Sequence, residues 1–194
     1  MQNKNLIYIL LKMNMTKINA MRRIKEEYNN INSNPISNIG VTIGLYQEDN
    51  FFEWKCSILG PRETNYRGGL FYLKIKFPDN YPESPPEILF ENPIYHLNVN
   101  SSSSTGFPVG KVYCNSLNNW KNYFNMVKIL PEIFVLLFKN NPDCGFDQEK
   151  NQEFRFNRQI FEEKIKYFTK KYANPMIGFK NSLQGLDWDF SIHK

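Results

Sequence analysis

The spacing of apolar residues constrains this fold most, because it changes from a helical period to strict alternation and back again. Residues 39–90 alternate, as in the runs Phe52, Trp54, Cys56, Ile58 and Phe71, Leu73, Ile75, Phe77. A period of two is typical of strands that bury one face. Turn-forming residues at 48–50, 60–61, 68–69 and 82–86 separate the runs. Such short connections join antiparallel neighbours, so the segment predicts a meander of about four strands.

Helical spacing flanks the predicted sheet. Before it, Ile24, Tyr28 and Ile31 predict an amphipathic helix that begins after Thr16 and ends near Pro35. After it, helical spacing returns at Met126, again after Asp147, and in a last run with Phe161, Ile165, Phe168 and Tyr172. Residues 91–125 have no clean period and predict a long loop, a feature that is usually functional in a compact domain. Helix, antiparallel sheet, loop and helices in this order predict an α+β domain.

The length favours one domain with terminal extensions. With 194 residues, of which 41% are hydrophobic and 15% aromatic, the chain can bury one core and is not a disordered sequence. We expect an N-terminal extension at 1–15, a core domain at 16–174 and a C-terminal tail at 175–194. The tail contains no motif that indicates a function.

Composition argues against several classes of function. The net charge of +5 is spread along the chain without a basic block, which disfavours nucleic acid as a partner. Three widely spaced cysteines and two histidines predict no metal site and no cofactor, and favour a reducing compartment. The apolar run at 6–11 is too short to cross a membrane or to form a signal peptide. We therefore expect a cytoplasmic and/or nuclear protein without a membrane partner.

A series of short motifs resembles the ubiquitin-conjugating enzyme family, and the motifs follow the order of that family over residues 20–173. They are Arg23-Ile24-Lys25-Glu26-Glu27, Gly60-Pro61, Tyr66-Arg67-Gly68-Gly69, Phe77-Pro78-Asp79-Asn80-Tyr81-Pro82, Pro85-Pro86, Ile94-Tyr95-His96-Leu97-Asn98, Gly110-Lys111-Val112-Tyr113-Cys114, Trp120, Leu136-Leu137 and Asn141-Pro142-Asp143. The resemblance implies the family's UBC fold: an N-terminal helix, a four-stranded antiparallel meander, an active-site loop and C-terminal helices.

The resemblance implies that Cys114 is the catalytic nucleophile. Cys114 would accept ubiquitin, or a ubiquitin-like protein such as NEDD8, from an activating enzyme as a thioester. It would then pass this modifier to a lysine of a substrate protein, usually with a ubiquitin ligase. Such a thiol must be exposed and moderately acidic. A free cysteine can instead be a small, buried apolar residue of the core, and this is our interpretation of Cys56.

Three further residues have roles that the resemblance implies. Asn98 would stabilise the oxyanion that forms when lysine attacks the thioester, or would brace the loop. His96 would hold the loop through hydrogen bonds. Asp143 is a candidate for orienting the incoming lysine, because an amine with a pKa of about 10.4 is mostly protonated at neutral pH.

The sequence also departs from the family pattern. Leu97 replaces the usual proline, and Cys144 stands where many members have an acidic residue or serine. The Ser-rich stretch 101–106 lengthens the loop before Cys114 and predicts a flexible, solvated insertion. Glu83 and the segment 121–123 alter the surface on which ligases of the common type would bind. A second hypothesis therefore stays open, a catalytically weak or silent relative that binds ubiquitin or stabilises a partner.

Two segments bear on which modifier is carried. Residues 157–162 are similar to the conjugating enzymes for NEDD8, which also have an N-terminal docking extension. Residues 1–15 are interpreted either as such a docking peptide or as a frayed extension. The sequence does not decide between the two modifiers.

Overall fold

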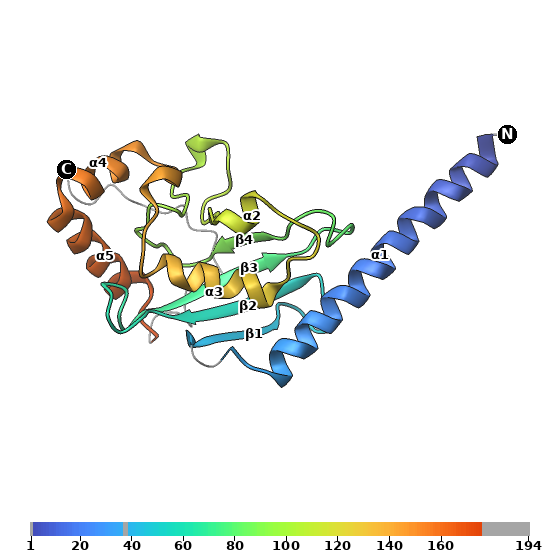
Figure 1. Ribbon diagram of the computed structural model, residues 1–194, viewed down its shortest axis with the longest axis horizontal. Coiled ribbons are helices and arrows are strands. Elements are labelled where there is room, and N and C mark those ends of the chain that lie inside the picture. The colour runs from blue at the N-terminus through green and yellow to red at the C-terminus, as the bar shows by residue number, and fades with distance from the viewer. Residues whose placement is uncertain (1, 37–38, 176–194) are drawn as a thin grey trace.

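A four-stranded antiparallel sheet lies at the centre of the protein, with strand order β1-β2-β3-β4 (Figure 1). The structure is a computed structural model that describes residues 2–36 and 39–175, so the predicted tail beyond Pro175 lies outside the described residues. The strands are β1 (Val41–Leu45), β2 (Glu53–Leu59), β3 (Leu70–Lys76) and β4 (Glu87–Phe90). Consecutive strands pair throughout, so the predicted meander is confirmed.

The alternating residues of β2 and β3 form the centre of the core. Trp54 pairs with Ile75 and Cys56 pairs with Leu73, and all four side chains are buried. Successive side chains of a strand point to opposite faces, so one face of the sheet packs inward while the other meets solvent. Cys56 is 1% exposed, which confirms the interpretation of this cysteine as a core residue.

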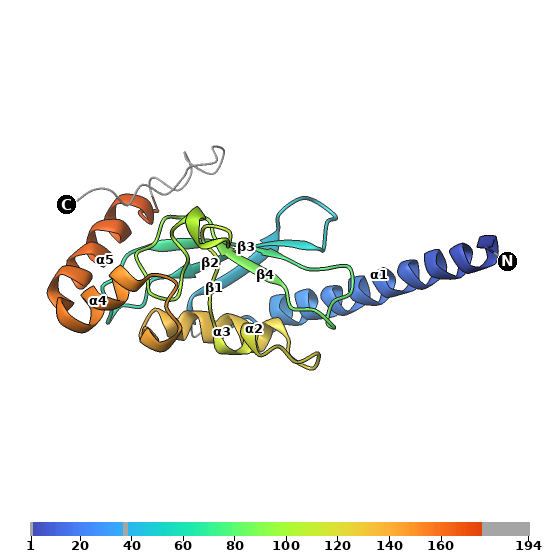
Figure 2. The same cartoon turned by 90° about the horizontal axis from the view of Figure 1, so that it is seen from above.

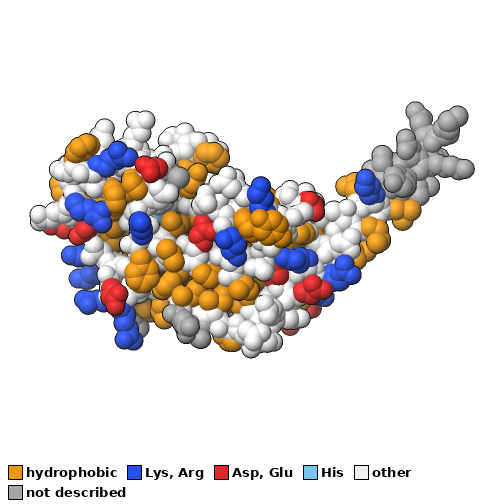
Figure 3. Space-filling model, in the orientation of Figure 1, with side chains coloured by type: hydrophobic (Ala, Val, Ile, Leu, Met, Phe, Trp, Pro, Cys, Tyr) orange, Lys and Arg blue, Asp and Glu red, His pale blue; other side chains and the backbone are white. Residues whose placement is uncertain are grey.

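The N-terminal helix α1 (Gln2–Ser33) is longer than predicted. The start predicted at Thr16 is wrong, because the Thr16 hydroxyl donates to the carbonyl of Lys12 within the helix at 3.0 Å. The later part of α1 buries Ala20 and Ile24 against the domain, whereas the earlier part extends away from it (Figures 1 and 2). Large apolar side chains such as Leu11 are exposed on this extending part (Figure 3).

Helices follow the sheet in the predicted order. They are α2 (Asn115–Asn118), α3 (Met126–Leu136), α4 (Gln148–Phe156) and α5 (Arg158–Tyr172). α3 continues through Pro131 and buries Met126, Ile129, Leu130 and Ile133, while α4 and α5 pack together at one end of the sheet (Figures 1 and 2). The predicted α+β UBC fold is confirmed. Within the described residues, no helix is both long and apolar enough to cross a membrane.

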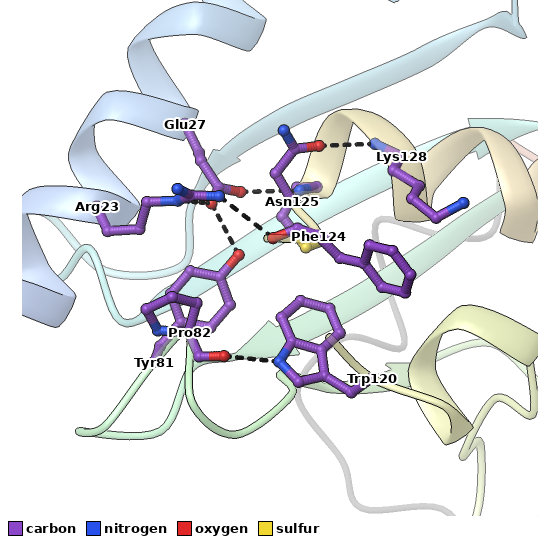
Figure 4. Close-up of polar contacts among 9 residues, drawn as sticks. Arg23, Glu27, Tyr81, Pro82, Trp120, Phe124, Asn125 and Lys128 are labelled. Carbon is purple, nitrogen blue, oxygen red and sulfur yellow. Dashed lines mark hydrogen bonds and ion pairs between the residues drawn. The ribbon is translucent and has the colours of Figure 1, made fainter. Parts of the chain in front are cut away.

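A buried carboxylate joins α1 to two distant segments (Figure 4). Glu27 is 6% exposed and accepts hydrogen bonds from the Tyr81 hydroxyl and from the backbone N–H of Met126, both at 2.8 Å. It also forms an ion pair with Arg23, one helical turn earlier, at 2.6 Å. One side chain therefore holds together α1, the turn before β4 and the first residue of α3.

The segment between α2 and α3 is anchored to the same turn (Figure 4). The indole N–H of Trp120 donates to the carbonyl of Pro82 at 2.7 Å. Arg23 donates to the carbonyl of Phe124 at 3.3 Å, and Asn125 caps α3 by accepting from the N–H of Lys128. These bonds fix the chain that leaves the loop containing Cys114.

Candidate active site

Backbone hydrogen bonds hold the segment that leads to Cys114. The N–H of Val112 donates to the carbonyl of Ile88 in β4 at 3.2 Å, and the N–H of Tyr113 donates to the carbonyl of Asn98 at 2.8 Å. Cys114 is thus placed by its neighbours' backbone, directly before α2, whose first residue follows it. The prediction of an irregular loop over 91–125 missed this four-residue helix.

Gly110 has a steric role in this segment. Its φ is +85°, a conformation that side chains disfavour, and a Cβ atom here would lie 2.2 Å from the carbonyl oxygen of Phe90. The N–H of Phe90 in turn donates to the carbonyl of Gly110 at 2.8 Å. A glycine four residues before Cys114 therefore lets the chain pass close to the end of β4.

The thiol of Cys114 is buried in this structure. The residue is 1% exposed, so the expected exposure and moderate acidity are wrong for this conformation. Burial raises the pKa of the Cys114 thiol to about 12, although the nearby backbone N–H of Leu117 lowers it. The negative charge of Glu132 raises this pKa further. The thiol is therefore protonated at neutral pH in this closed conformation.

Glu132 is a site residue that sequence reasoning missed. It lies on α3, and its Oε1 atom accepts a hydrogen bond from the backbone N–H of Ser116 at 3.0 Å. Ser116 is the second residue of α2, two positions after Cys114. The available signal was weak: a single acidic residue within the apolar stretch of α3.

Asn98 braces two loops against each other. Its amide Oδ1 accepts from the N–H of Asn141 and its Nδ2 donates to the carbonyl of Asn141, both at 2.9 Å. Asn98 is fully buried. Of the two roles implied for this residue, the reciprocal pair supports loop bracing, and the oxyanion role stays a prediction.

His96 lies next to this brace. Its Nδ1 accepts from the N–H of Asn98 at 2.9 Å, which leaves Nε2 to donate to the carbonyl of Leu136 at the same distance. Burial lowers the pKa of His96 to about 4, so the ring is neutral at physiological pH. These contacts suit the loop-holding role implied for His96 better than proton transfer, and that role stays a prediction.

The carboxylate of Asp143 contacts a different element. Its side chain is 83% exposed, and its carboxylate lies 3.6 Å from the guanidinium of Arg155 on α4. The structure thus brings His96 and Asn98 together but pairs Asp143 with a different element. The side chain of Cys144 lies outside the described part of the structure.

Local hydrogen bonds hold the backbone at Leu97, which stands where the family usually has proline. The side chain is fully buried, and its N–H donates to the amide oxygen of Asn140 at 3.4 Å. Its carbonyl accepts from the N–H of Phe146 at 3.2 Å. Proline has no N–H to form the first of these bonds. The loop therefore does not depend on proline for its conformation.

Internal contacts hold the Ser-rich insertion, although residues such as Ser103, Ser104 and Gly106 are exposed, as expected for a solvated loop. The buried amide of Asn100 donates to three carbonyls, those of Ser102 and Phe107 at 2.9 Å and that of Pro108 at 3.0 Å. Lys150 on α4 is 3% exposed and donates to the hydroxyl of Ser101 at 2.6 Å. The insertion is thus tied both to itself and to α4.

Comparison with known proteins agrees with this architecture. Residues 23–169 match the family model described as ubiquitin-conjugating enzyme. The curated protein "Probable ubiquitin-conjugating enzyme E2 31" from Arabidopsis thaliana is 36% identical over 156 residues, which cover 80% of this chain and 94% of that protein. The chain belongs to the ubiquitin-conjugating enzyme family, and the resemblance seen in its motifs is confirmed.

Proposed function

We propose that this protein accepts ubiquitin, or a ubiquitin-like protein such as NEDD8, as a thioester on Cys114 and passes it to a substrate lysine. The observation that carries the proposal is the position of Cys114 in this family fold: backbone bonds to β4 and to the braced Asn98 loop fix the residues before it. Its partners would be an activating enzyme, a ligase and the substrate protein, in the cytoplasm and/or nucleus.

The reaction has two acyl-transfer steps. The Cys114 thiolate attacks the thioester carbonyl that links the modifier to the activating enzyme. A C–S bond to Cys114 forms, the C–S bond to the activating enzyme breaks, and the cysteine of that enzyme leaves as a thiolate. A lysine amine of the substrate then attacks the new thioester, the C–N bond forms, and the Cys114 thiolate leaves. Neither step needs an oxidant or a metal.

The first step requires the buried thiol to open. Because burial raises the pKa of Cys114 to about 12, little thiolate forms in the closed conformation. α2 begins directly after Cys114, has only four residues and is tied to α3 through the bond between Ser116 and Glu132. We expect the activating enzyme to shift α2 and thereby expose the sulfur.

Asn98, His96 and Asp143 keep supporting roles in this proposal. Asn98 and His96 hold the loop that faces Cys114, and an N–H of the Asn98 amide would stabilise the oxyanion if the amide turns toward the thioester. Asp143, whose side chain is 83% exposed, would guide the lysine through electrostatic attraction.

A second candidate function is supported by one observation. The closed, protonated state of Cys114 is also what a catalytically silent relative would have, one that binds ubiquitin or stabilises a partner. The two candidates differ in whether the sulfur becomes reactive when an activating enzyme is present.

A charging assay separates them. The protein is incubated with ATP and either ubiquitin or NEDD8 plus the matching activating enzyme, and adducts are resolved without reductant. We expect a reductant-sensitive adduct on the wild type and on Cys56→Ser, and only a reductant-resistant ester or nothing on Cys114→Ser. The absence of an adduct with either modifier would favour the silent relative.

A further inference from the structure

Glu132 lies next to Cys114, because its carboxylate interacts with the Cys114 thiol and with the backbone N–H of Ser116. The bond from the N–H of Ser116 to its Oε1 fixes the carboxylate over the first turn of α2, directly after Cys114. The residue is half-buried on α3, so it is both held by the protein and open to solvent. A carboxylate has two oxygens. One of them accepts from Ser116, and the carboxylate also takes part in a side-chain hydrogen bond with the Cys114 thiol, which acylation of the sulfur would remove.

A carboxylate at this position is unfavourable for the first step of the reaction. Its negative charge opposes the formation of a second negative charge on the Cys114 sulfur. This disadvantage disappears once the sulfur is acylated, because a thioester is uncharged. A role for Glu132 is therefore expected in the second step.

In the second step a positive charge develops close to Cys114. As the amine nitrogen attacks the thioester carbonyl, the nitrogen becomes cationic and the carbonyl oxygen becomes anionic. A fixed carboxylate stabilises the cationic nitrogen more strongly than the neutral amine, which is the requirement for catalysis. It can also accept the proton that this nitrogen must lose.

We propose that Glu132 is the catalytic carboxylate of the discharge step, which orients the substrate lysine at the Cys114 thioester and accepts its proton as the C–N bond forms. The proton then passes to water, the tetrahedral intermediate collapses, and the Cys114 thiolate leaves. This inference rests on the proposed function. It assigns to Glu132 the role that the sequence suggested for Asp143, whose carboxylate is mostly exposed and faces Arg155.

The test compares Glu132→Gln with Asp143→Asn. Glutamine keeps the shape of Glu132 and an oxygen that can accept from Ser116, but it removes the charge and the proton acceptor. Each variant is charged with ubiquitin, activating enzyme and ATP, charging is stopped by removing ATP, and free lysine is added. Single-turnover discharge is followed over a range of lysine concentrations, and hydrolysis without lysine is measured in parallel.

We expect Glu132→Gln to charge at least as fast as the wild type and to discharge to lysine on the order of 100-fold more slowly. Hydrolysis should change little, and Glu132→Asp should restore part of the lysine rate. Asp143→Asn, which removes only a long-range attraction for the lysine, should slow discharge far less than Glu132→Gln. Alkylation of Cys114 in the uncharged protein should be faster in Glu132→Gln, with its pH profile shifted to lower pH.

Three results would overturn the proposed role of Glu132 and leave the proposed function intact. They are lysine discharge in Glu132→Gln equal to that of the wild type, a larger loss in Asp143→Asn, or equal slowing of charging, hydrolysis and discharge in Glu132→Gln. Equal slowing would mark Glu132 as structural. A wild type that does not charge with any activating enzyme would instead overturn the proposed function, and the inference with it.

Discussion

Replacing Glu27 with alanine should destabilise the domain strongly, because one carboxylate serves three partners. The substitution deprives the buried N–H of Met126 and the Tyr81 hydroxyl of their acceptor. A buried donor left without a partner costs about 1–3 kcal/mol. It also breaks the ion pair with Arg23, in which the Glu27 side chain is 7% exposed and the Arg23 side chain 34%. Breaking a buried pair costs about 3–5 kcal/mol, and the partial exposure of Arg23 relieves some of this cost.

We therefore expect Glu27→Ala to lower the free energy of unfolding by about 3–5 kcal/mol, measured by urea denaturation at pH 7. The chain contains a matched control, Arg158 and Glu162, which also lie one helical turn apart, at 2.8 Å, but are 55% and 38% exposed. Glu162→Ala should cost about 0.3–0.5 kcal/mol. A loss below about 1 kcal/mol in Glu27→Ala, or equal losses in the two variants, would refute the argument that burial makes the difference.

Two further stability predictions follow from the loops around Cys114. Burial lowers the pKa of His96 from 6.5 to about 4, so between these values the unfolded chain binds a proton that the folded protein does not. Because of His96, the free energy of unfolding falls as the pH drops below about 6.5. The loss is about 2 kcal/mol between pH 7 and pH 5. Urea titrations at several pH values should show this slope and its disappearance in His96→Asn; an unchanged slope in the variant would contradict it. Asn100→Ala should make the stretch 101–109 far more sensitive to limited proteolysis, because three loop carbonyls lose their common donor. Ser103→Ala, at an exposed position of the same insertion, is the control, and equal cleavage of the two variants would show that Asn100 does not order the loop.

The sheet could be predicted from the sequence because each strand carries its own signal. Alternation along β2 and β3 reports burial of one face, and local turn residues separate the strands. The start of α1 was not predictable in the same way. Thr16 is a typical N-cap residue, but the first 34 residues contain no Gly or Pro to end a helix, and the Thr16 hydroxyl bonds back to Lys12.

From the sequence, only those residues of the candidate site that belong to recognisable motifs could be predicted. The resemblance placed Cys114, Asn98 and His96 in one site, and the structure brings the last two into direct contact. The position of Glu132 depends on how α3 packs beside α2, and no local pattern encodes that packing. Composition likewise predicted a solvated Ser-rich loop, but it could not predict the contacts that hold this loop, which come from the buried amide of Asn100 and from Lys150 on a distant helix.

On the proposed function, the burial of Cys114 is compatible with thioester chemistry because α2, which begins directly after Cys114, is a weak element. α2 has four residues, and an isolated helix of one turn is unstable, since nucleation fixes several residues for a single hydrogen bond. Its order therefore depends on tertiary contacts such as the bond between Ser116 and Glu132. The strands and α1 provide the stability of the domain, while local opening of α2 breaks few contacts. If Cys114 carries the modifier as proposed, a partner that competes for these contacts would expose the sulfur without unfolding the domain.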